Sequence, residues 1–227
     1  MAGARNTVLA GIRRALGADA TDDRTPTVER RLRDHPRGPS VARTGGDAAA
    51  QRALFLAKVA ESAATFAELH SLDQVPAAIA DYLRAHNLPP MVRVAPDPAL
   101  ATLNWSAAPM LAVSTGPSDG SDPVSLTGCV AGIAETGTLM LASGADNPTG
   151  LAFLPETHVV VVRTDQLVGG LEDAFDRLRA TRGPGGSGNW PRAINFITGP
   201  SRSGDIEQQL QMGAHGPRQL HVLLVDG

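Results

Sequence analysis

Apolar residues recur along this chain in two periods, one typical of helices and one typical of strands. Apolar side chains at steps of three and four residues predict amphipathic helices, because such residues share one helix face. Asp47 and Asp165 directly precede two of these stretches and are predicted N-caps. The stretches with this spacing are Val8–Leu16, Ala48–Leu69, the segment after Pro76 and Leu167–Leu178.

Short apolar runs without helical spacing predict buried strands. They are Met91–Ala95, Pro109–Ser114, Val124–Thr127, Ile133–Leu141 and His158–Arg163. The run Ile133–Leu141 is interrupted at Glu135-Thr-Gly137, whereas His158–Arg163 is rich in β-branched residues and predicts a central strand. Strands that alternate with helices predict an α/β sheet covered on both faces.

The C-terminal region predicts a parallel βαβ unit. Ile194–Ile197 is the first strand, Ile206 and Leu210 have helical spacing, and His221–Val225 is the second strand. In such units, small ligands bind beyond the carboxyl ends of the strands. The polar residues expected at that edge are Ser201, Arg202 and Asp205.

The segment Asp19–Gly46 is rich in Arg, Asp, Pro and Thr and poor in apolar residues, so it predicts a linker or extended arm. The chain is therefore divided into residues 1–45, an N-terminal helix with an arginine-rich arm, and residues 46–227, the α/β domain. A solvated connector and a docking arm for an acidic partner both remain possible for the arm.

Composition limits the classes of function. With 227 residues, of which 42% are hydrophobic, the chain can form one sizeable core. The net charge of −3 provides no global basic field, so no nucleic-acid partner is predicted. No apolar stretch reaches the roughly 20 residues that a membrane span requires.

Single residues narrow the chemistry further. Cys129 is the only cysteine, so the chain can form no internal disulfide and cannot by itself hold an iron–sulfur cluster. We therefore expect a cytoplasmic location, and a buried, inert thiol at Cys129. Lys58 is the only lysine, which argues against Schiff-base chemistry and a phosphate-loop lysine.

The run Gly183–Gly188 formally matches the dinucleotide pattern G-x-G-x-x-G. That pattern binds pyrophosphate only where it follows a strand and opens a helix. Here a predicted helix precedes the run and a strand follows it, so a surface loop is predicted instead.

Glu135-Thr136-Gly137-Thr138 is a candidate catalytic motif. A glutamate within a strand run would be buried and needs a partner, and Gly137 permits a bulge or a close backbone approach. Two flanking hydroxyl groups could orient a ligand. The alternative is a structural glutamate that is satisfied by a backbone amide or an arginine.

The run Gly199-Pro200-Ser201-Arg202 is a candidate anion site at the start of the predicted C-terminal helix. Free N–H groups and the helix dipole favour an anion there, and the Arg202 guanidinium suits a carboxylate or phosphate. Plain helix capping by Ser203, with Asp205 in the first turn, is the alternative.

His215 and Gly216 lie in the turn that ends the same predicted helix. His215 stands close to two glycines and could reach a ligand from a tight turn, although a structural or solvated histidine is the alternative. No cluster of His, Asp and Glu has metal-ligand spacing, so no metal and no cofactor is predicted in this chain.

Three motifs together resemble the LUD-domain family, and within it the LutC-type subunits of lactate utilisation. They are IAETGTLML (133–141), ITGPSRSGDIE (197–207) and GAHGP (213–217). The resemblance implies a three-layer αβα domain with a mostly parallel sheet, like that of ribose-phosphate isomerase, glucosamine-phosphate deaminase and CoA-transferases. It also implies a non-redox subunit that works with iron–sulfur partner proteins in oxidising L-lactate to pyruvate.

Three functions stay open from the sequence. The first is such a subunit, binding an organic anion or a nucleotide-like ligand. The second is a stand-alone transferase or isomerase that uses Glu135 on a thioester or sugar phosphate. The third is a scaffold that joins partners through its N-terminal arm.

Overall fold

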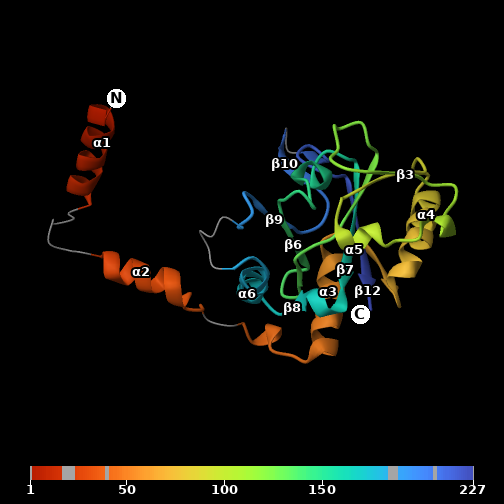
Figure 1. The fold of residues 1–227 in the computed structure, drawn as a ribbon, viewed down its shortest axis with the longest axis horizontal. Coiled ribbons are helices and arrows are strands. Elements are labelled where there is room, and N and C mark those ends of the chain that lie inside the picture. The colour runs from red at the N-terminus through yellow and green to blue at the C-terminus, as the bar shows by residue number, and fades with distance from the viewer. Residues whose placement is uncertain (1, 17–23, 39–40, 184–188, 207–208, 227) are drawn as a thin grey trace. The chain divides into compact units, whose positions relative to one another are not determined.

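The structure is a computed structural model, and it describes residues 2–16, 24–38, 41–183, 189–206 and 209–226 (Figure 1). Most of the loop predicted at 183–188 lies outside these ranges. Residue 207, the last residue of the motif 197–207, also lies outside them. The chain forms two compact units, Met1–Pro39 and Ser40–Gly227. Residues 40–45, expected to belong to the arm, are grouped with the larger unit.

The N-terminal unit contains two helices. The predicted amphipathic helix is confirmed as α1 (Ala2–Ala15), and a second helix, α2 (Thr25–Asp34), forms within the segment predicted as a linker. No residue of α2 is buried. The apolar side chains of Val8, Ile12, Val28 and Leu32 are exposed, so neither helix contributes to a core.

The large unit is built on a six-stranded parallel sheet, which confirms the predicted α/β class with a mostly parallel sheet. Its strand order is β1-β12-β7-β4-β2-β3. The β-branched run is strand β7, and it lies inside the sheet as predicted. The strands are β1 (Thr65–Leu69), β2 (Met91–Val94), β3 (Ala112–Thr115), β4 (Val124–Thr127), β7 (Thr157–Arg163) and β12 (Gln219–Val225).

Both faces of this sheet are covered by apolar layers. Val159 and Val161 of β7 face the helices α4 (Val75–Ala85) and α5 (Pro98–Ala101). Val160 and Val162 face the opposite layer, which contains α3 (Ala48–Glu61). Successive side chains of a strand point to opposite faces, so a strand buried on both sides must be apolar throughout.

The second layer also contains a four-stranded sheet that the sequence did not predict, with order β8-β5-β6-β9. On β6, Leu139 and Leu141 face the large sheet, whereas Met140 and Ala142 face helix α6. Figure 1 shows α4 and α6 on opposite sides of the large unit, with the sheets between them. The elements are β5 (Ala131–Ile133), β6 (Thr138–Ala142), β8 (Leu167–Val168), β9 (Ile194–Ile197) and α6 (Leu171–Arg182).

Two predicted helices have different bounds. The Asp47 carboxylate caps α3 as expected and accepts a hydrogen bond from the Ala50 N–H at 2.8 Å. The helix ends at Glu61 instead of Leu69, because Ala63 turns the chain at φ 64° and residues 65–69 pair with β12.

Asp165 is not the cap of the later helix. It belongs to the 3₁₀ helix η5 (Thr164–Gln166), and its carboxylate pairs with Arg163 and Arg177. Helix α6 begins at Leu171 after the N-cap residue Gly170. The predicted start at Leu167 was wrong because that residue pairs in β8.

The predicted C-terminal βαβ unit is also wrong. Strand β9 runs antiparallel to β6 in the small sheet, whereas β12 lies in the large sheet. Between them, β10 (Arg202–Ile206) and β11 (Gln209–Met212) form an antiparallel pair where a helix was expected. Gly204 disfavours a helix interior, and Gly213, at φ +82°, turns the chain after β11.

Candidate functional site

A cavity of about 400 Å³ opens beside the loop that joins β9 to β10. We call it the Ser201 cavity. It brings together six of the predicted ligand-binding residues from two chain segments. The β9–β10 loop contributes Gly199, Pro200 and Ser201, and Arg202 follows as the first residue of β10. The turn after β11 contributes His215 and Gly216.

Gly199 allows the loop to approach the end of α3. Its φ is +74°, and a Cβ atom there would lie 2.4 Å from the carbonyl oxygen of Ser62. Any other residue would therefore suffer both backbone strain and a steric clash. The glycine fixes one wall of the Ser201 cavity against a rigid helix end.

Ser201 is held by three hydrogen bonds. Its N–H donates to the Pro217 carbonyl at 2.8 Å, and its own carbonyl accepts from the Gly213 N–H at 2.9 Å. The Oγ atom accepts from the His215 N–H at 3.2 Å. Because Oγ is used as an acceptor there, its proton remains available to a ligand in the cavity.

Arg202 has a structural contact that the sequence did not predict. Its guanidinium donates to the carbonyl oxygen of Ser62, which follows the last turn of α3. Arg202 also lines the Ser201 cavity and is exposed, and a guanidinium has further N–H donors for a ligand. No helix begins at this loop, so the expected anion site at a helix N-terminus is replaced by side-chain donors.

Glu135 lies in the turn between β5 and β6 and is not among the residues that line the Ser201 cavity. Its carboxylate pairs with Arg43 at 3.2 Å, and its N–H donates to the Gly169 carbonyl at 3.0 Å. Gly137, at φ +66°, packs its backbone against Lys58. In these contacts Glu135 is satisfied by an arginine, as the structural alternative anticipated.

Threonine hydroxyl groups connect this turn to the cavity. Thr136 Oγ1 and Thr138 Oγ1 are 2.6 Å apart, and Thr138 Oγ1 is 2.6 Å from Thr198 Oγ1. Thr198 lines the Ser201 cavity and was not among the predicted site residues. Thr136 and Thr138 therefore do not line the Ser201 cavity, but they form a chain of hydrogen bonds that ends at Thr198 in its wall.

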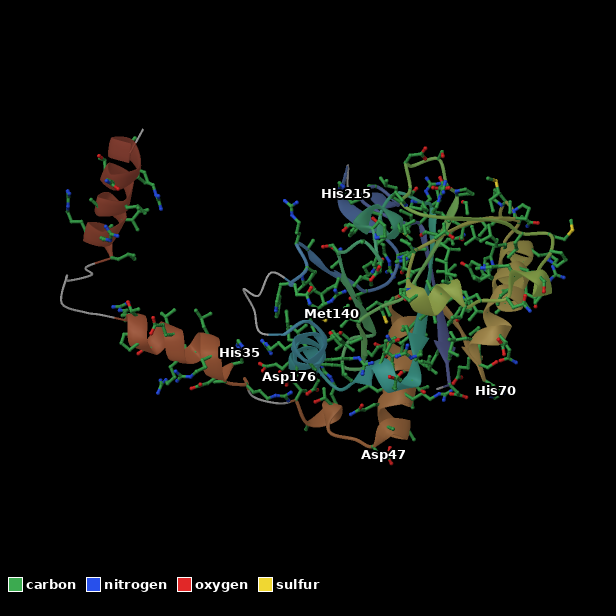
Figure 2. All side chains as sticks on the ribbon, viewed as in Figure 1. His35, Asp47, His70, Met140, Asp176 and His215 are labelled. Atoms are coloured by element: carbon green, nitrogen blue, oxygen red, sulfur yellow. The ribbon has the colours of Figure 1, made fainter. Side chains whose placement is uncertain are left out.

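The Ser201 cavity lies at the amino-terminal edge of the parallel sheet. In its wall, Phe153 lies four residues before the start of β7 and Pro217 lies two residues before the start of β12. Figure 2 shows His215 at one end of the large unit and His70, which follows the carboxyl end of β1, at the other. The expectation that Ser201 and Arg202 lie beyond the carboxyl ends of these strands was wrong, because β9 belongs to the small sheet.

Sequence reasoning also missed the apolar part of the wall. Phe153 and Phe196 line the Ser201 cavity and are 39% and 43% exposed. Their signal was weak, since exposed single aromatic residues are common on surfaces. Asp205, predicted as a site residue, belongs to β10, and its side chain lies outside the part that the structure describes.

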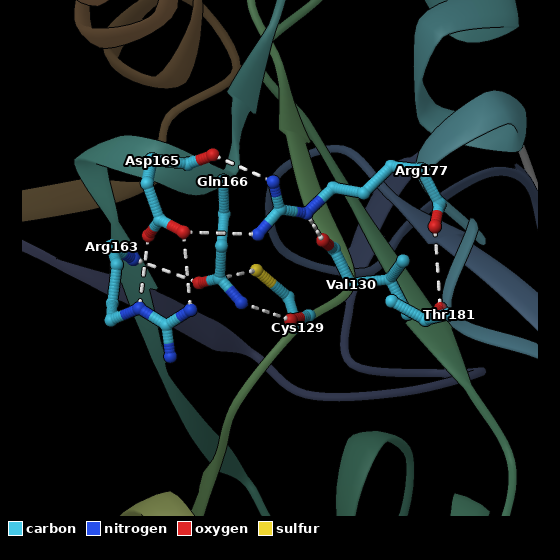
Figure 3. Close-up of polar contacts among 7 residues, drawn as sticks. All are labelled: Cys129, Val130, Arg163, Asp165, Gln166, Arg177 and Thr181. Atoms are coloured by element: carbon cyan, nitrogen blue, oxygen red, sulfur yellow. Dashed lines mark hydrogen bonds and ion pairs between the residues drawn. The ribbon is translucent and has the colours of Figure 1, made fainter.

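Cys129 lies in a cluster of polar residues at the other edge of the sheet (Figure 3). Burial raises the pKa of its thiol to about 12. The Gln166 amide donates to the Cys129 carbonyl at 2.8 Å, and Arg177 Nε donates to the Val130 carbonyl at 2.9 Å. A thiol with this pKa is protonated at neutral pH, in agreement with the predicted inert cysteine, but the residue is half-buried and not fully buried as predicted.

Within the described ranges, no three His, Cys, Asp or Glu side chains are placed so that they could hold a metal ion. A search of the same residues found no helix of sufficient length and apolarity to cross a membrane.

Comparison with known proteins gives a family match over part of the chain. Residues 120–225 match the family model of the LUD domain. The chain contains a LUD domain. The resemblance deduced from the three motifs is thus confirmed, and the matched LUD region includes β4 through β12 and every residue assigned to the Ser201 cavity.

Proteins similar to this chain include several named lactate utilization protein C. The chain is 37% identical over 108 residues to the one from Deinococcus radiodurans, covering 47% of this chain and 48% of that protein. It is 38% identical over 93 residues to the one from Bacillus subtilis, covering 41% and 38%. The matched region therefore spans less than half the length of these relatives.

A solved structure supports the fold. It is the crystal structure of a DUF162 family protein from Deinococcus radiodurans, which is 25% identical and superposes with a TM-score of 0.55. The match covers 79% of this chain and 99% of that one.

Proposed function

We propose that this protein is a non-redox subunit of a lactate-utilisation system and binds a small organic anion in the Ser201 cavity. The observation that carries the proposal is the similarity of 37% over 108 residues to lactate utilization protein C. Because that similarity covers only part of each chain, the proposed activity is also argued from the residues of the Ser201 cavity.

The chemistry of the cavity wall supports a small carboxylate such as lactate or pyruvate. Arg202 offers a guanidinium, Ser201 a hydroxyl proton, and His215 an exposed imidazole. Carboxylates are bound well by planar guanidinium groups and by hydroxyl donors. Phe153 and Phe196 provide apolar surface for the remaining carbon atoms.

The electron-transfer step belongs to partner proteins in this proposal. Cys129 is the only cysteine, so iron–sulfur clusters would have to be carried by other chains. A cytoplasmic location is part of the proposal. The position of Glu135, paired with Arg43 and absent from the cavity wall, gives the transferase alternative no support.

A thermal-shift titration with L-lactate and pyruvate tests the binding step. A ligand at about 100 times its dissociation constant stabilises the native state by about 2.7 kcal/mol. We expect this shift for the unmodified chain and its loss in Ser201→Ala. Ser71→Ala is the matched control, since Ser71 caps no backbone group and lies outside the cavity. No shift with either compound, or an equal shift in Ser201→Ala, would refute the assignment of the cavity.

Genetic complementation tests the pathway separately. The chain is expressed in Bacillus subtilis lacking its lactate utilization protein C, and growth on L-lactate is compared with the parent. Restored growth supports the proposal, and co-purified proteins with the visible absorbance of iron–sulfur clusters would identify the partners. Failure to restore growth, with the chain expressed and folded, contradicts the proposed role.

A further inference from the structure

A second candidate site lies where the chain leaves β2 and β4, which are neighbours in the parallel sheet. After β2 the chain continues through α5, which packs on one face of the sheet. After β4 it continues into β5 and β6, which pack on the other face. Neighbouring strands whose connections leave toward opposite faces open a crevice beyond their carboxyl ends, and ligands bind in such crevices.

A cavity of about 210 Å³ occupies this position. We call it the Gly128 cavity. Asp97, three residues after β2, and Gly128, directly after β4, both line it. A Cβ atom on Gly128 would lie 2.8 Å from Asp97 Oδ2, so glycine lets this carboxylate approach the strand end. Asp97 Oδ1 is already used, since it accepts from the Ala99 N–H at 2.8 Å.

A larger cavity of about 460 Å³ shares one wall residue with it. We call it the Trp190 cavity. Arg182 lines both cavities, and Arg192, Ser143 and Thr149 add polar groups to the larger one. The Trp190 indole is fixed, because its Nε1 donates to the Gly183 carbonyl at 2.8 Å and its ring packs on the apolar cluster beneath α6.

Arg192 is the group most available to a ligand. It is exposed, it lines the Trp190 cavity, and it has no ion-pair partner within the described part of the chain. The Ala193 N–H next to it donates to Ser143 Oγ at 2.9 Å. That bond fixes the backbone around Arg192 and leaves the Ser143 hydroxyl proton free for a ligand.

We propose that the Gly128 and Trp190 cavities together bind a nucleoside phosphate. Arginine binds phosphate oxygens through paired N–H groups, which assigns the phosphate to Arg182 and Arg192. The fixed indole of Trp190 offers an aromatic face on which a base can stack. The carboxylate of Asp97 can accept hydrogen bonds from ribose hydroxyl groups.

This site is separate from the proposed anion site. None of its residues lines the Ser201 cavity. The Gly128 cavity lies beyond the carboxyl ends of β2 and β4, whereas the Ser201 cavity is lined by residues that come before β7 and β12. Failure of one proposal therefore leaves the other intact.

Tryptophan fluorescence tests the proposal in the full-length chain. The only other tryptophan is Trp105, which packs on the opposite face of the large sheet. In a Trp105→Phe background the emission reports Trp190 alone. ATP, ADP, adenosine and inorganic phosphate are titrated separately.

We expect saturable quenching by ATP or ADP and at least tenfold weaker binding of adenosine and of phosphate. Arg192→Gln should weaken nucleotide binding at least tenfold. Arg84→Gln, on an exposed arginine of α4, is the matched control and should leave it unchanged. A fluorescence-independent measurement, calorimetry on Trp190→Leu, should show the same loss.

Three results would overturn the proposal. The first is the absence of saturable quenching together with no calorimetric signal for ATP in the unmodified chain. The second is equal affinity for ATP and inorganic phosphate, which would reduce the site to a simple anion site. The third is unchanged nucleotide affinity in both Arg192→Gln and Trp190→Leu, which would place the ligand elsewhere.

Discussion

His158 is a buried ionisable residue inside the large unit. It is fully buried on β7, and its Nε2 lies 2.8 Å from Thr127 Oγ1. Among the residues that the structure describes, its Nδ1 has no hydrogen-bond partner. Burial lowers the pKa of His158 from its usual 6.5 to about 3, and burial also lowers that of His221 to about 4. The folded state therefore holds both rings neutral.

This arrangement makes the fold sensitive to acid. Below pH 6.5 the unfolded chain binds protons at these rings and the folded chain does not, so the free energy of unfolding falls as the pH drops toward about 4. Above pH 6.5 the two rings contribute no pH dependence. Urea denaturation at a series of pH values measures this slope.

The variant His158→Gln isolates one of the two rings. Glutamine can still bond to Thr127 but does not titrate, so we expect a shallower loss of stability below pH 6.5 than in the unmodified chain. His35→Asn is the control, because His35 is only half-buried, belongs to none of the core clusters, and has a left-handed backbone that asparagine tolerates. An unchanged slope in His158→Gln would contradict the assignment of a neutral buried ring.

Gly199 provides a second test at the residue scale. Replacement by alanine places Cβ against the Ser62 carbonyl and strains a backbone at φ +74°, which should cost roughly 1–3 kcal/mol in unfolding free energy. Gly216→Ala is a matched control in the same cavity wall, since its nearest neighbour would be 3.6 Å from the new Cβ. Equal destabilisation of the two variants would argue against the close approach of this loop to α3.

Among the elements, helix α6 packs on the small sheet through apolar residues and is also hydrogen-bonded to the chain before β5 and β8 through Arg177. Arg177 Nε donates to the Val130 carbonyl, and Nη1 donates to the Asp165 carbonyl at 2.7 Å (Figure 3). Its Nη2 also pairs with the Asp165 carboxylate at 3.2 Å. Because hydrogen bonds of a charged group are strong, Arg177→Met should lower the unfolding free energy by about 2 kcal/mol.

Chemical denaturation of Arg177→Met measures this loss. Arg177→Lys should not restore it, since an ammonium group cannot reach the three acceptors with the geometry of a guanidinium. Arg84→Met removes an exposed pair with Asp81 and should change stability by less than about 0.5 kcal/mol. A loss of similar size in Arg84→Met would show that the geometry of Arg177 is not the cause.

The same scale shows which elements can be predicted from sequence. Strand β7 and helix α4 were predicted because the side chains of each element determine its secondary structure. Strand β7 is a β-branched run that is buried on both faces, and helix α4 has one apolar face. The β10–β11 pair was predicted as a helix, because Ile206 and Leu210 fit either period over so few residues. The partner of a strand is a long-range property, which explains why β9 and β12 were assigned to one sheet.

Only part of the candidate site could be predicted, because only some of its residues belong to a local sequence pattern. Gly199 to Arg202 and His215 were found because glycine, proline and polar residues gather in two short segments that the fold brings together. Phe153 and Phe196 come from other segments and carry no local signal. The partner of Glu135 is Arg43, 92 residues away, and no local pattern could have named it.

For the whole molecule, the division after Pro39 has consequences for stability. Helix α2 has no buried residue, and the large exposed apolar side chains of α1 lie outside any core. The core clusters of the protein consist entirely of residues from the large unit. The arm is therefore expected to contribute little to the free energy of unfolding.

Removal of residues 1–39 tests this expectation. The truncated chain keeps Arg43 and its pair with Glu135, so its thermal midpoint should stay within a few degrees of that of the full chain. Removal of residues 1–45 also deletes Arg43 and Thr44, whose carbonyl packs against Gly169, and should lower the midpoint further. Calorimetry on the two truncations separates the contributions. An equal fall of the midpoint in both truncations would mean that residues 1–39 stabilise the protein and residues 40–45 do not, which contradicts the expectation. If a protein that co-purifies with the full chain still bound after removal of residues 1–39 but not after removal of residues 1–45, residues 40–45 would be needed for that binding and the arm would not be the docking element.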